Sequence, residues 1–399
     1  MRGITSGILI FTLIILVVEI LGFLGITLLV RRKKRRWMVG VTYWFFTAVF
    51  LTLWLAAFLD TEKIRHTTDY SFFYLAIFIS VLNFFPKALL SLFVILSVPF
   101  SLARDKIRSQ IILLSGLILS SGMVLTIGYG LIAGKKVIRM EEFRLDIADL
   151  PAGLNGVKIV HISDIHLGSY GRDRFLKRCV EKINKVEPDF ILFTGDMVNN
   201  FYQEIVDFED QLGEFKARSG KFAILGNHDY GDYSDWNSPK DKALNLKRIK
   251  QKVGEAGFQL LLNRSVKVNI RDTSLYIIGV ENWGHPPFPQ YARLDSARQN
   301  IPEKSFQILL THDPAHWSDQ VLYKTDIPLT LAGHTHGGQF AIKIAGMEFS
   351  LISLINKYWG GLYRENNQFL YVNRGLGCVG LPARIDMAPE ITVITLFRE

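Results

Sequence analysis

The chain has 399 residues, of which 49% are hydrophobic, and its mean hydropathy is +0.20. This composition favours a chain that lies partly in lipid. The formal net charge is +9, but residues 1–134 hold 13 Lys and Arg against five Asp and Glu, so the excess belongs to the hydrophobic third. That argues against a nucleic-acid-binding protein, which needs a basic face on its folded domain. Two cysteines, Cys179 and Cys378, exclude a disulfide scaffold and a Cys-rich zinc module. We expect two buried free thiols, with one disulfide as the alternative.

Four apolar stretches precede residue 135, and each is long enough to cross a membrane, which takes about 20 residues. They are approximately Gly7–Val30, Trp37–Leu59, Tyr70–Phe100 and Gln110–Gly134. The first is too long for a signal peptide and is followed by three more, so we interpret it as a span. Residues 1–134 are therefore expected to form an all-α bundle of about four transmembrane helices.

The basic residues of this region predict its orientation. Arg31–Arg36 reads RRKKRR, and Arg104, Lys106 and Arg108 form a second basic loop. The positive-inside rule places both loops in the cytoplasm. The amino terminus and everything after the fourth span are then expected outside, in a multi-pass protein of the cell membrane.

The third stretch carries Asn83, Pro86 and Lys87 near its middle. We interpret it as one kinked span. Two short passes are the alternative, and they would place the carboxy-terminal domain in the cytoplasm instead. Glu19 and Lys87 are ionisable residues in apolar surroundings, which is costly and often functional. Facing one another or reaching the membrane surface explains them equally well, so no role is assigned to either.

Residues 135–150 are polar and of mixed charge, and we interpret them as a linker to a domain over residues 151–399. Short apolar runs of the kind that form buried strands then begin. They are Val157–Ile162, Phe190–Thr194, Lys221–Leu225, Leu275–Val280, Phe306–Leu310, Leu329–Leu331, Phe369–Val372 and Ile391–Phe397. Helical patterns cover residues 172–187 and 241–256. This alternation predicts an α/β sandwich with its helices outside.

Five polar segments follow strand-like runs, each with histidine or aspartate beside small residues. They are Asp164-Ile165-His166, Gly195-Asp196, Gly226-Asn227-His228-Asp229, Thr311-His312-Asp313 and Gly333-His334-Thr335-His336. One such segment alone is weak evidence. Five in order, on five strand ends, indicate a single site, because ligands of α/β sheets bind at the carboxyl ends of the strands.

The residue types favour a pair of transition-metal ions. The candidate ligands are Asp164, His166, Asp196, Asn227, His312, His334 and His336. Imidazole and carboxylate groups without thiolate suit Zn, Mn or Fe. Seven groups are too many for one tetrahedral ion, and two ions about 3.5–4 Å apart can clamp a phosphoester and activate a shared water to hydroxide. No organic-cofactor site is predicted.

These segments resemble the calcineurin-like metallophosphoesterases, whose pattern runs D-x-H, G-D, G-N-H-[DE], H, G-H-x-H. The match is complete and ordered from Val157 to His336. The resemblance implies a four-layer α/β/β/α sandwich. It also implies that one metal is held by Asp164, His166 and His336, a second by Asn227, His312 and His334, and both by a bridging Asp196.

The same resemblance implies that His228 contacts the substrate phosphate and protonates the leaving oxygen as a general acid. Asp229 is placed to orient His228. The stretch NRGLG at Asn373–Gly377 and GGQ at Gly337–Gln339 resemble a bacterial membrane-tethered subgroup. Arg374 could then face the phosphate, since Arg suits oxyanions. A salt bridge that fixes its loop is the alternative.

Four other histidines are interpreted as structural or solvated residues, and one apolar run has two possible interpretations. We expect no metal role for His161, His285, His316 or His66. The apolar run Phe349–Leu362 either belongs to the core or lies against the bilayer, where it would help a lipid head group reach the metals.

The leading hypothesis is a membrane-anchored, metal-dependent phosphoric ester hydrolase that cleaves a phosphodiester or pyrophosphate bond through a metal-activated hydroxide. Its substrate would be a phosphate ester, which the membrane location suggests is lipid-linked. A nucleotide-lipid pyrophosphatase of lipid A synthesis is the alternative if the domain faces the cytoplasm. A non-catalytic scaffold or sensor should have lost ligands, and a transporter should show ionisable or helix-breaking pairs at the membrane midplane; both are disfavoured.

Overall fold

The computed structural model describes the whole chain except residues 1, 31, 60–65, 171–173, 286–288 and 345–346. The chain divides into two compact units. One is helical and comprises residues 1–64 and 71–131. The other comprises residues 132–399 and also includes residues 66–70, which come from the connection between two helices of the first unit.

Four long apolar helices make up the helical unit, and all four meet the length and hydropathy of membrane spans. They are α1 (Arg2–Leu29), α2 (Lys33–Leu59), α4 (Ser71–Leu102) and α5 (Lys106–Ile132). The prediction of about four helices is confirmed. The third stretch forms one continuous helix, α4, which passes through Pro86 and Pro99 without a break. The single-span interpretation of that stretch therefore agrees with the structure.

The two ionisable residues of the spans pair with each other inside the helical unit. The Glu19 carboxylate is buried and accepts from Lys87 Nζ at 2.8 Å and Thr47 Oγ1 at 2.6 Å. Its second oxygen accepts from Asn83 Nδ2 at 2.7 Å. The group joins α1, α2 and α4, and hydrogen bonds from three partners offset the cost of burying the carboxylate. The structure thus matches the interpretation in which Glu19 and Lys87 face one another.

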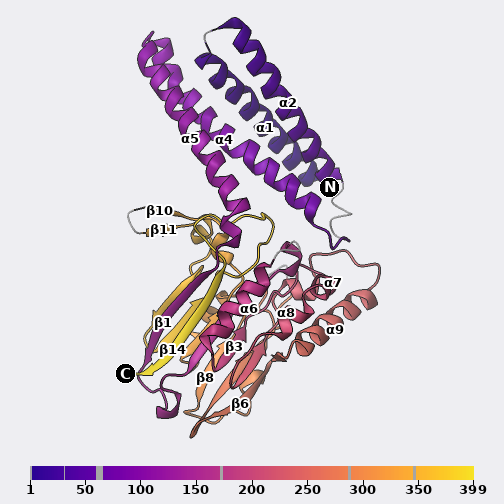
Figure 1. Cartoon of the computed structure of the whole chain (residues 1–399), viewed down its shortest axis with the longest axis vertical. Helices are drawn as coiled ribbons and strands as arrows, with labels where there is room; N and C mark the ends of the chain where they lie inside the picture. The colour runs from indigo at the N-terminus through magenta and orange to yellow at the C-terminus, as the bar shows by residue number, and fades with distance from the viewer. Residues whose placement is uncertain (1, 31, 60–65, 171–173, 286–288, 345–346) are drawn as a thin grey trace. The chain divides into compact units, whose positions relative to one another are not determined.

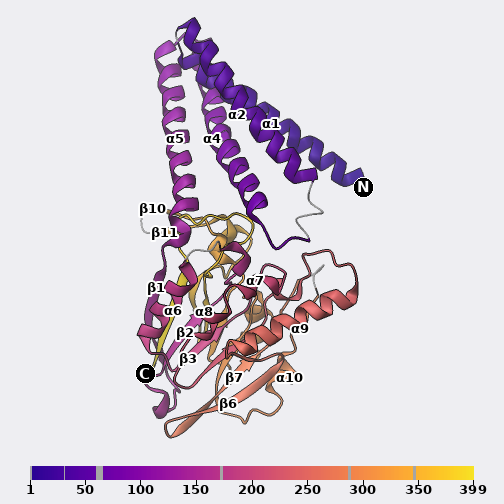
Figure 2. The same ribbon diagram turned by 45° about the vertical axis from the view of Figure 1, so that its right-hand side comes forward.

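Two six-stranded sheets form the second unit (Figures 1 and 2). In the first sheet the order is β1 (Arg139–Ile147), β14 (Glu390–Arg398), β2 (Lys158–Ile162), β3 (Phe190–Phe193), β4 (Gly220–Ala223) and β5 (Gln259–Leu260). In the second it is β12 (Gly361–Glu365), β13 (Gln368–Val372), β9 (Leu329–Ala332), β8 (Phe306–Leu310), β7 (Thr273–Gly279) and β6 (Arg264–Ile270). All eight predicted runs coincide with strands.

The sheets pack face to face because alternate residues of each strand point to opposite faces. Ile159 and Leu192 of the first sheet share a buried cluster with Ile308 and Leu331 of the second. The outer face of the first sheet is covered by α6 (Phe175–Val186), α8 (Glu209–Gly213) and α9 (Pro239–Glu255). The outer face of the second packs on α10 (Leu294–Arg298) and the short π-helix Trp317–Val321. The α/β/β/α sandwich is confirmed.

Parallel strand pairs bring the polar segments to one edge. β2, β3 and β4 run parallel, with Ile162 opposite Phe193. In the second sheet β7, β8, β9 and β13 also run parallel. Since parallel strands end at the same edge, the loops that follow them collect there. This arrangement positions the candidate site.

Residues 135–150 differ from the linker interpretation. Nine of them form β1, which pairs in parallel with β14 from Arg139 opposite Glu390 to Ile147 opposite Arg398. β1 is an edge strand whose Leu145 and Ile147 are buried while Glu142 and Arg144 are exposed. Edge strands carry charged residues on their solvent side. The sequence of this segment is polar for that reason, and it was therefore interpreted as a linker. Both cysteines are buried and neither forms a disulfide, which agrees with the prediction of two buried thiols.

Candidate metal centre

The predicted site residues follow five strands of the two sheets and meet at one place. Asp164 and His166 follow β2, Asp196 follows β3, Asn227 and His228 follow β4, His312 follows β8, and His334 and His336 follow β9. Three overlapping groups of these side chains have ligand atoms close enough to hold a metal ion. They are Asp164 with His166 and His336, His166 with Asp196 and His228, and Asp164 with Asp196 and His312.

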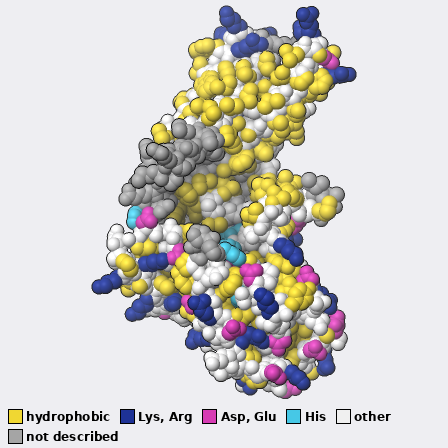
Figure 3. All heavy atoms as spheres, turned by 180° about the vertical axis from the view of Figure 1, so that it is seen from behind, with side chains coloured by type: hydrophobic (Ala, Val, Ile, Leu, Met, Phe, Trp, Pro, Cys, Tyr) yellow, Lys and Arg dark blue, Asp and Glu magenta, His cyan; other side chains and the backbone are white. Residues whose placement is uncertain are grey.

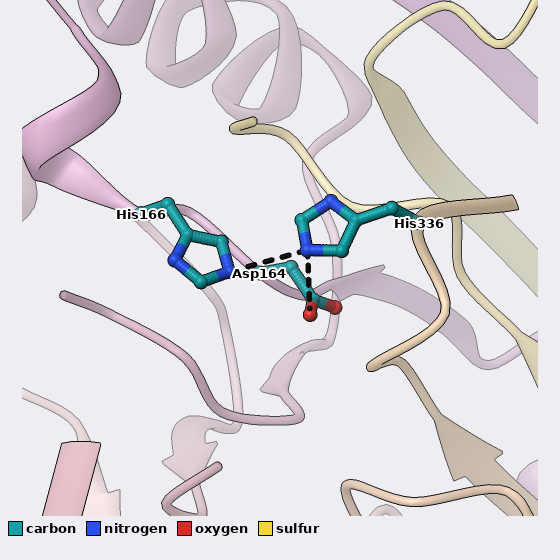
Figure 4. Close-up of side chains that lie close together, drawn as sticks. All are labelled: Asp164, His166 and His336. Atoms are coloured by element: carbon teal, nitrogen blue, oxygen red, sulfur yellow. Dashed lines mark hydrogen bonds and ion pairs between the residues drawn. The ribbon is translucent and has the colours of Figure 1, made fainter. Parts of the chain in front are cut away.

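The first group is compact and buried. His336 Nε2 lies 3.3 Å from Asp164 Oδ1 and 3.1 Å from His166 Nε2 (Figure 4). Figure 4 shows the three side chains pointing toward one another from two loops, with Asp164 and His166 on the loop after β2 and His336 on the loop after β9. Two imidazole nitrogens at this separation, with a carboxylate oxygen beside them, offer three ligand atoms to one ion.

Asp196 connects this group to a second one. Its Oδ2 lies 3.5 Å from His166 Nε2 and 3.2 Å from His312 Nε2. The second group also includes His334, whose Nδ1 lies 3.0 Å from Asn227 Oδ1. The ring centroids of His312 and His334 are 5.1 Å apart. The carboxylate of Asp196 therefore stands between two sets of nitrogen and oxygen donors.

The loops adopt an unusual backbone to aim these side chains. Positive φ angles occur at Asp164 (48°), His166 (46°), Asp196 (60°), His334 (73°) and His336 (52°). Such angles are uncommon outside glycine and cluster at functional sites. Gly226 is also required, because a Cβ there would collide with the Asp196 carboxylate.

Partners behind the ligands fix their rings. His166 Nδ1 lies 2.9 Å from Asn199 Oδ1, and His312 Nδ1 lies 2.7 Å from the Thr194 carbonyl oxygen. Both acceptors place the ring proton on Nδ1 and leave Nε2 free for a metal, the usual arrangement behind a ligating histidine. His336 differs, since its Nδ1 lies 3.1 Å from a guanidinium nitrogen of the buried Arg384.

Burial and mutual charge shift the pKa values of the site. Burial raises the pKa of Asp164 to about 6 and lowers that of His166 to about 3. Burial alone would raise the pKa of Asp196, but the neighbouring His312 and His228 hold it well below its usual range. Conversely, burial would lower the pKa of His312, but Asp196 raises it to about 10. An ionised Asp196 and a neutral His166 are the forms that bind metals, whereas His312 has to release its Nε2 proton when an ion binds.

The donor set fits a divalent cation. His312 Nε2 is buried and has no hydrogen-bond partner among the described residues, although it faces the Asp196 carboxylate. Nitrogen and oxygen donors without thiolate suit Zn, Mn or Fe. Cys179 and Cys378 belong to none of the candidate ligand groups.

His228 stands at the accessible side of the site. Its ring is partly exposed, stacks on Tyr233 at 4.5 Å between centroids, and lies 4.9 Å from the His166 ring. Its Nδ1 lies 2.7 Å from the Asn199 carbonyl oxygen. Because that carbonyl accepts the Nδ1 proton, Nε2 is the nitrogen available to a bound molecule.

Asp229 was expected to orient His228, but the structure gives this carboxylate another role. It accepts from the backbone N–H groups of Asp196 at 2.9 Å, Met197 at 2.9 Å, Val198 at 3.2 Å and Gly226 at 2.9 Å. Asp229 thus ties the loop after β3 to the loop after β4. The His228 ring is oriented by Asn199 instead.

Replacing Asp229 by Ala is expected to destabilise this domain. Four buried N–H groups would lose their acceptor, and each unsatisfied buried donor costs about 1–3 kcal/mol, so a loss of about 3 kcal/mol or more in the free energy of unfolding follows. Guanidinium unfolding of the metal-free protein measures it. Asp229→Asn keeps one acceptor oxygen and should lose less; equal stability of the Ala variant and the parent would contradict the role.

Arg374 is engaged by carboxylates. Its guanidinium lies 3.2 Å from Glu390, 3.0 Å from Glu348 and 3.4 Å from Glu141. These ion pairs match the alternative in which Arg374 fixes its loop. A contact with substrate phosphate stays a prediction.

The remaining histidines lie outside the candidate ligand groups of the described residues. His161 is buried in β2 with Nε2 2.9 Å from Thr194 Oγ1, and His316 is buried with Nδ1 3.1 Å from Thr311 Oγ1. His285 is half exposed, 3.6 Å from Asp313, and His66 is exposed.

Two positioning groups were missed by the sequence reasoning. Asn199 contacts both His166 and His228, and the only available signal was its place three residues after Asp196. Glu204 is buried and accepts from the backbone N–H groups of Gly168, Asn199, Asn200 and Phe201. Tyr70 adds a hydroxyl donor to the same carboxylate at 3.2 Å.

Comparison with known proteins assigns the family. The profile of the calcineurin-like phosphoesterases matches residues 157–338, and that of a probable calcineurin-like phosphoesterase transmembrane domain matches residues 1–135. An uncharacterized metallophosphoesterase of Bacillus subtilis, YkuE, is 33% identical over 272 residues, which cover 65% of this chain and 86% of that protein. The chain belongs to the calcineurin-like metallophosphoesterases.

Two further relatives match different shares of the chain. An uncharacterized metallophosphoesterase of Campylobacter jejuni is 28% identical over 396 residues, which cover 97% of this chain and 98% of that protein, so the similarity includes the helical unit. The UDP-2,3-diacylglucosamine pyrophosphatase LpxG of Chlamydia muridarum is 28% identical over 273 residues, covering 57% of this chain and 79% of that protein. This metallophosphoesterase is a multi-pass membrane protein with a candidate metal site of Asp and His residues.

Proposed function

We propose that the chain is a membrane-anchored phosphoesterase that uses two divalent metal ions to hydrolyse a phosphodiester or pyrophosphate bond. One observation carries the proposal: the Asp196 carboxylate lies within 3.5 Å of His166 and His312, which belong to separate donor sets. A shared carboxylate between two donor sets is the arrangement that a dinuclear centre requires.

In this proposal the ligands divide around Asp196. Asp164, His166 and His336 hold one ion, and Asn227, His312 and His334 hold the other. Bound divalent ions, which could be Mn, Fe or Zn, polarise phosphoryl oxygens and supply hydroxide near neutral pH. The amide of Asn227 adds no charge, so the centre stays attractive to an anionic phosphate.

His228 serves as the general acid in this proposal. It is partly exposed, whereas Asp164, His166, Asp196, His312 and His336 are buried, so it lies where a substrate arrives. Its Nδ1 proton is engaged by the Asn199 carbonyl, which directs Nε2 toward the site. Protonated Nε2 can then donate its proton to the leaving oxygen, and a positioned acid of this kind contributes about 10²–10⁴ in rate.

The membrane unit favours a lipid-linked or envelope substrate. The basic loops at residues 31–36 and 104–108 support a phosphoesterase domain outside the cytoplasm, as the positive-inside rule predicts. An external protease that fails to reach a carboxy-terminal tag on intact cells would contradict this side. A cytoplasmic domain would favour the second candidate, a nucleotide-lipid pyrophosphatase, which the similarity to the chlamydial pyrophosphatase supports.

The test uses the full chain in detergent, stripped with a chelator and reloaded with Mn, Zn or Mg. We expect two ions per chain and metal-dependent hydrolysis of bis-p-nitrophenyl phosphate. Cleavage of p-nitrophenyl phosphate alone would replace the diesterase with a monoesterase. A metal-loaded protein that cleaves neither compound nor a nucleotide-lipid pyrophosphate would contradict the enzyme and favour a scaffold.

A further inference from the structure

An exposed apolar patch lies beside the candidate metal centre. It consists of Ile342, Met347, Phe349, Leu351, Leu354 and Ile355, which come from β10 (Ile342–Ile344), β11 (Met347–Phe349) and the short 3-10 helix η7 (Leu351–Leu354) with the residue after it. Met347, Leu354 and Ile355 are 72%, 70% and 79% exposed. Figure 3 shows hydrophobic side chains gathered on this projecting part of the domain. Contiguous apolar surface of this kind marks an interaction site.

The patch is attached to the loop that carries the last two candidate ligands. Ser350, within the patch segment, donates through Oγ to the carbonyl oxygen of Gly337 at 2.9 Å. Thr335, between His334 and His336, donates through Oγ1 to the Trp359 carbonyl oxygen at 2.7 Å. A molecule held by the patch is therefore close in the fold to groups that would bind its phosphate.

Charge around the patch suits a lipid surface. Its one acidic residue, Glu348, is surrounded by three cations: Arg374 at 3.0 Å, Lys343 at 2.9 Å and Arg139 at 3.9 Å. Lys343 is 46% exposed as a side chain, and Lys357 is also exposed. An apolar surface with a neutralised acid and exposed lysines at its rim is typical of a segment that enters the membrane interface.

The short connection between the fourth span and the sheet indicates that the chain's own membrane covers the patch. The fourth candidate span runs Lys106–Lys136, and β1 begins at Arg139, so residues 137–138 alone separate the span from the sheet. A connection this short reaches at most about 10 Å. Arg139, the first residue of β1, pairs with Glu348 of the patch hairpin. The patch is thus tethered within reach of the bilayer that holds α5.

We propose that the patch inserts into the surface of the chain's own membrane and receives the apolar part of a lipid phosphodiester or lipid pyrophosphate, whose phosphate then reaches the metal centre. This substrate class rests on the proposed function. The bound lipid would leave its acyl chains among the patch residues, and hydrolysis would release a water-soluble phosphate-bearing or alcohol product from the membrane-held remainder.

The test compares two diesters with the same leaving group. Full-length protein is reconstituted in vesicles of phosphatidylcholine and phosphatidylglycerol, and assayed on dioleoylphosphatidyl-p-nitrophenol and on water-soluble bis-p-nitrophenyl phosphate. The triple variant Leu351→Ser, Leu354→Ser, Ile355→Ser is expected to lose about tenfold or more on the lipid diester, equivalent to about 1.4 kcal/mol. Its rate on the soluble diester should stay unchanged. The control Leu244→Ser removes an exposed leucine on α9.

Equal losses on both diesters, or none on the lipid, would overturn the inference. The inference would also be overturned if light scattering showed a dimer for the parent and a monomer for the triple variant, because the patch would then bind a second copy of the chain. A readout without catalysis separates this inference from the proposed function: a fluorophore on Leu354→Cys should be quenched by spin-labelled lipids, and one on Leu244→Cys should not. The buried Cys179 and Cys378 leave the introduced thiol as the reactive one. Absence of quenching would reject the patch even if the enzyme is active.

Discussion

Replacement of Asp196 by Asn is expected to abolish hydrolysis and to reduce the bound metal below two ions per chain. The carboxylate lies 3.5 Å from His166 Nε2 and 3.2 Å from His312 Nε2, so both donor sets lose their shared anion. The loss should exceed the roughly 10–100-fold that removal of an outer partner costs, because Asp196 would touch the metals directly. Metal content and the rate on bis-p-nitrophenyl phosphate, measured on the same sample, check it.

Asp189→Asn is the matched control. Asp189 is also buried and also accepts a backbone N–H, that of Lys158 at 2.8 Å. It precedes β3, however, whereas Asp196 follows it, so it lies at the opposite end of the strand. This control should keep both ions and most of the rate. An Asp196→Asn protein with two tightly bound ions would show that the bridging assignment is wrong.

His228→Gln is expected to lower the rate by about 10²–10⁴ on substrates with a poor leaving group while both metals stay bound. The general acid matters most when the leaving oxygen is basic, so the loss should shrink for p-nitrophenolate, which departs without a proton. Rates for a series of diesters of decreasing leaving-group acidity measure the effect. A steeper dependence of rate on leaving-group pKa in the variant is the specific signature.

His285→Gln provides the comparison for this variant, because His285 is half exposed and belongs to none of the candidate ligand groups among the described residues. It should leave the dependence unchanged. If His228→Gln instead lost metal, or lost the same factor on every diester, His228 would act as a ligand or a structural group and not as the acid.

The interior strands were predictable and the edge strands were not. β3 and β8 are buried along their whole length, so they read as unbroken apolar runs. β6 and β12 lie at the edges of the second sheet, and each mixes exposed residues with partly or fully buried ones. β1, also an edge strand, was not predicted for the same reason. Which strand lies at an edge depends on long-range pairing, and local composition does not encode it.

The candidate ligands could be predicted from sequence, whereas their supports could not. Each ligand lies at a fixed spacing directly after a strand, as in Asp164-Ile165-His166. Arg384 approaches His336 from 48 residues away, in a segment without a recognisable motif. Asp229 is adjacent to His228 in sequence, yet its carboxylate faces the loop after β3. Such contacts follow from loop backbone conformations that only the folded chain specifies.

The contact of Tyr70 with Glu204 constrains how many times the chain crosses the membrane. The Tyr70 hydroxyl donates to Glu204 inside the phosphoesterase domain, although α4 begins at the very next residue. The chain therefore leaves the domain at Tyr70 and returns to it after α5. Tyr70 and β1 can share one domain only if the chain crosses the bilayer an even number of times between them. The pair α4 and α5 is then a two-span insertion into the phosphoesterase domain, and a third stretch that doubled back would part Tyr70 from Glu204.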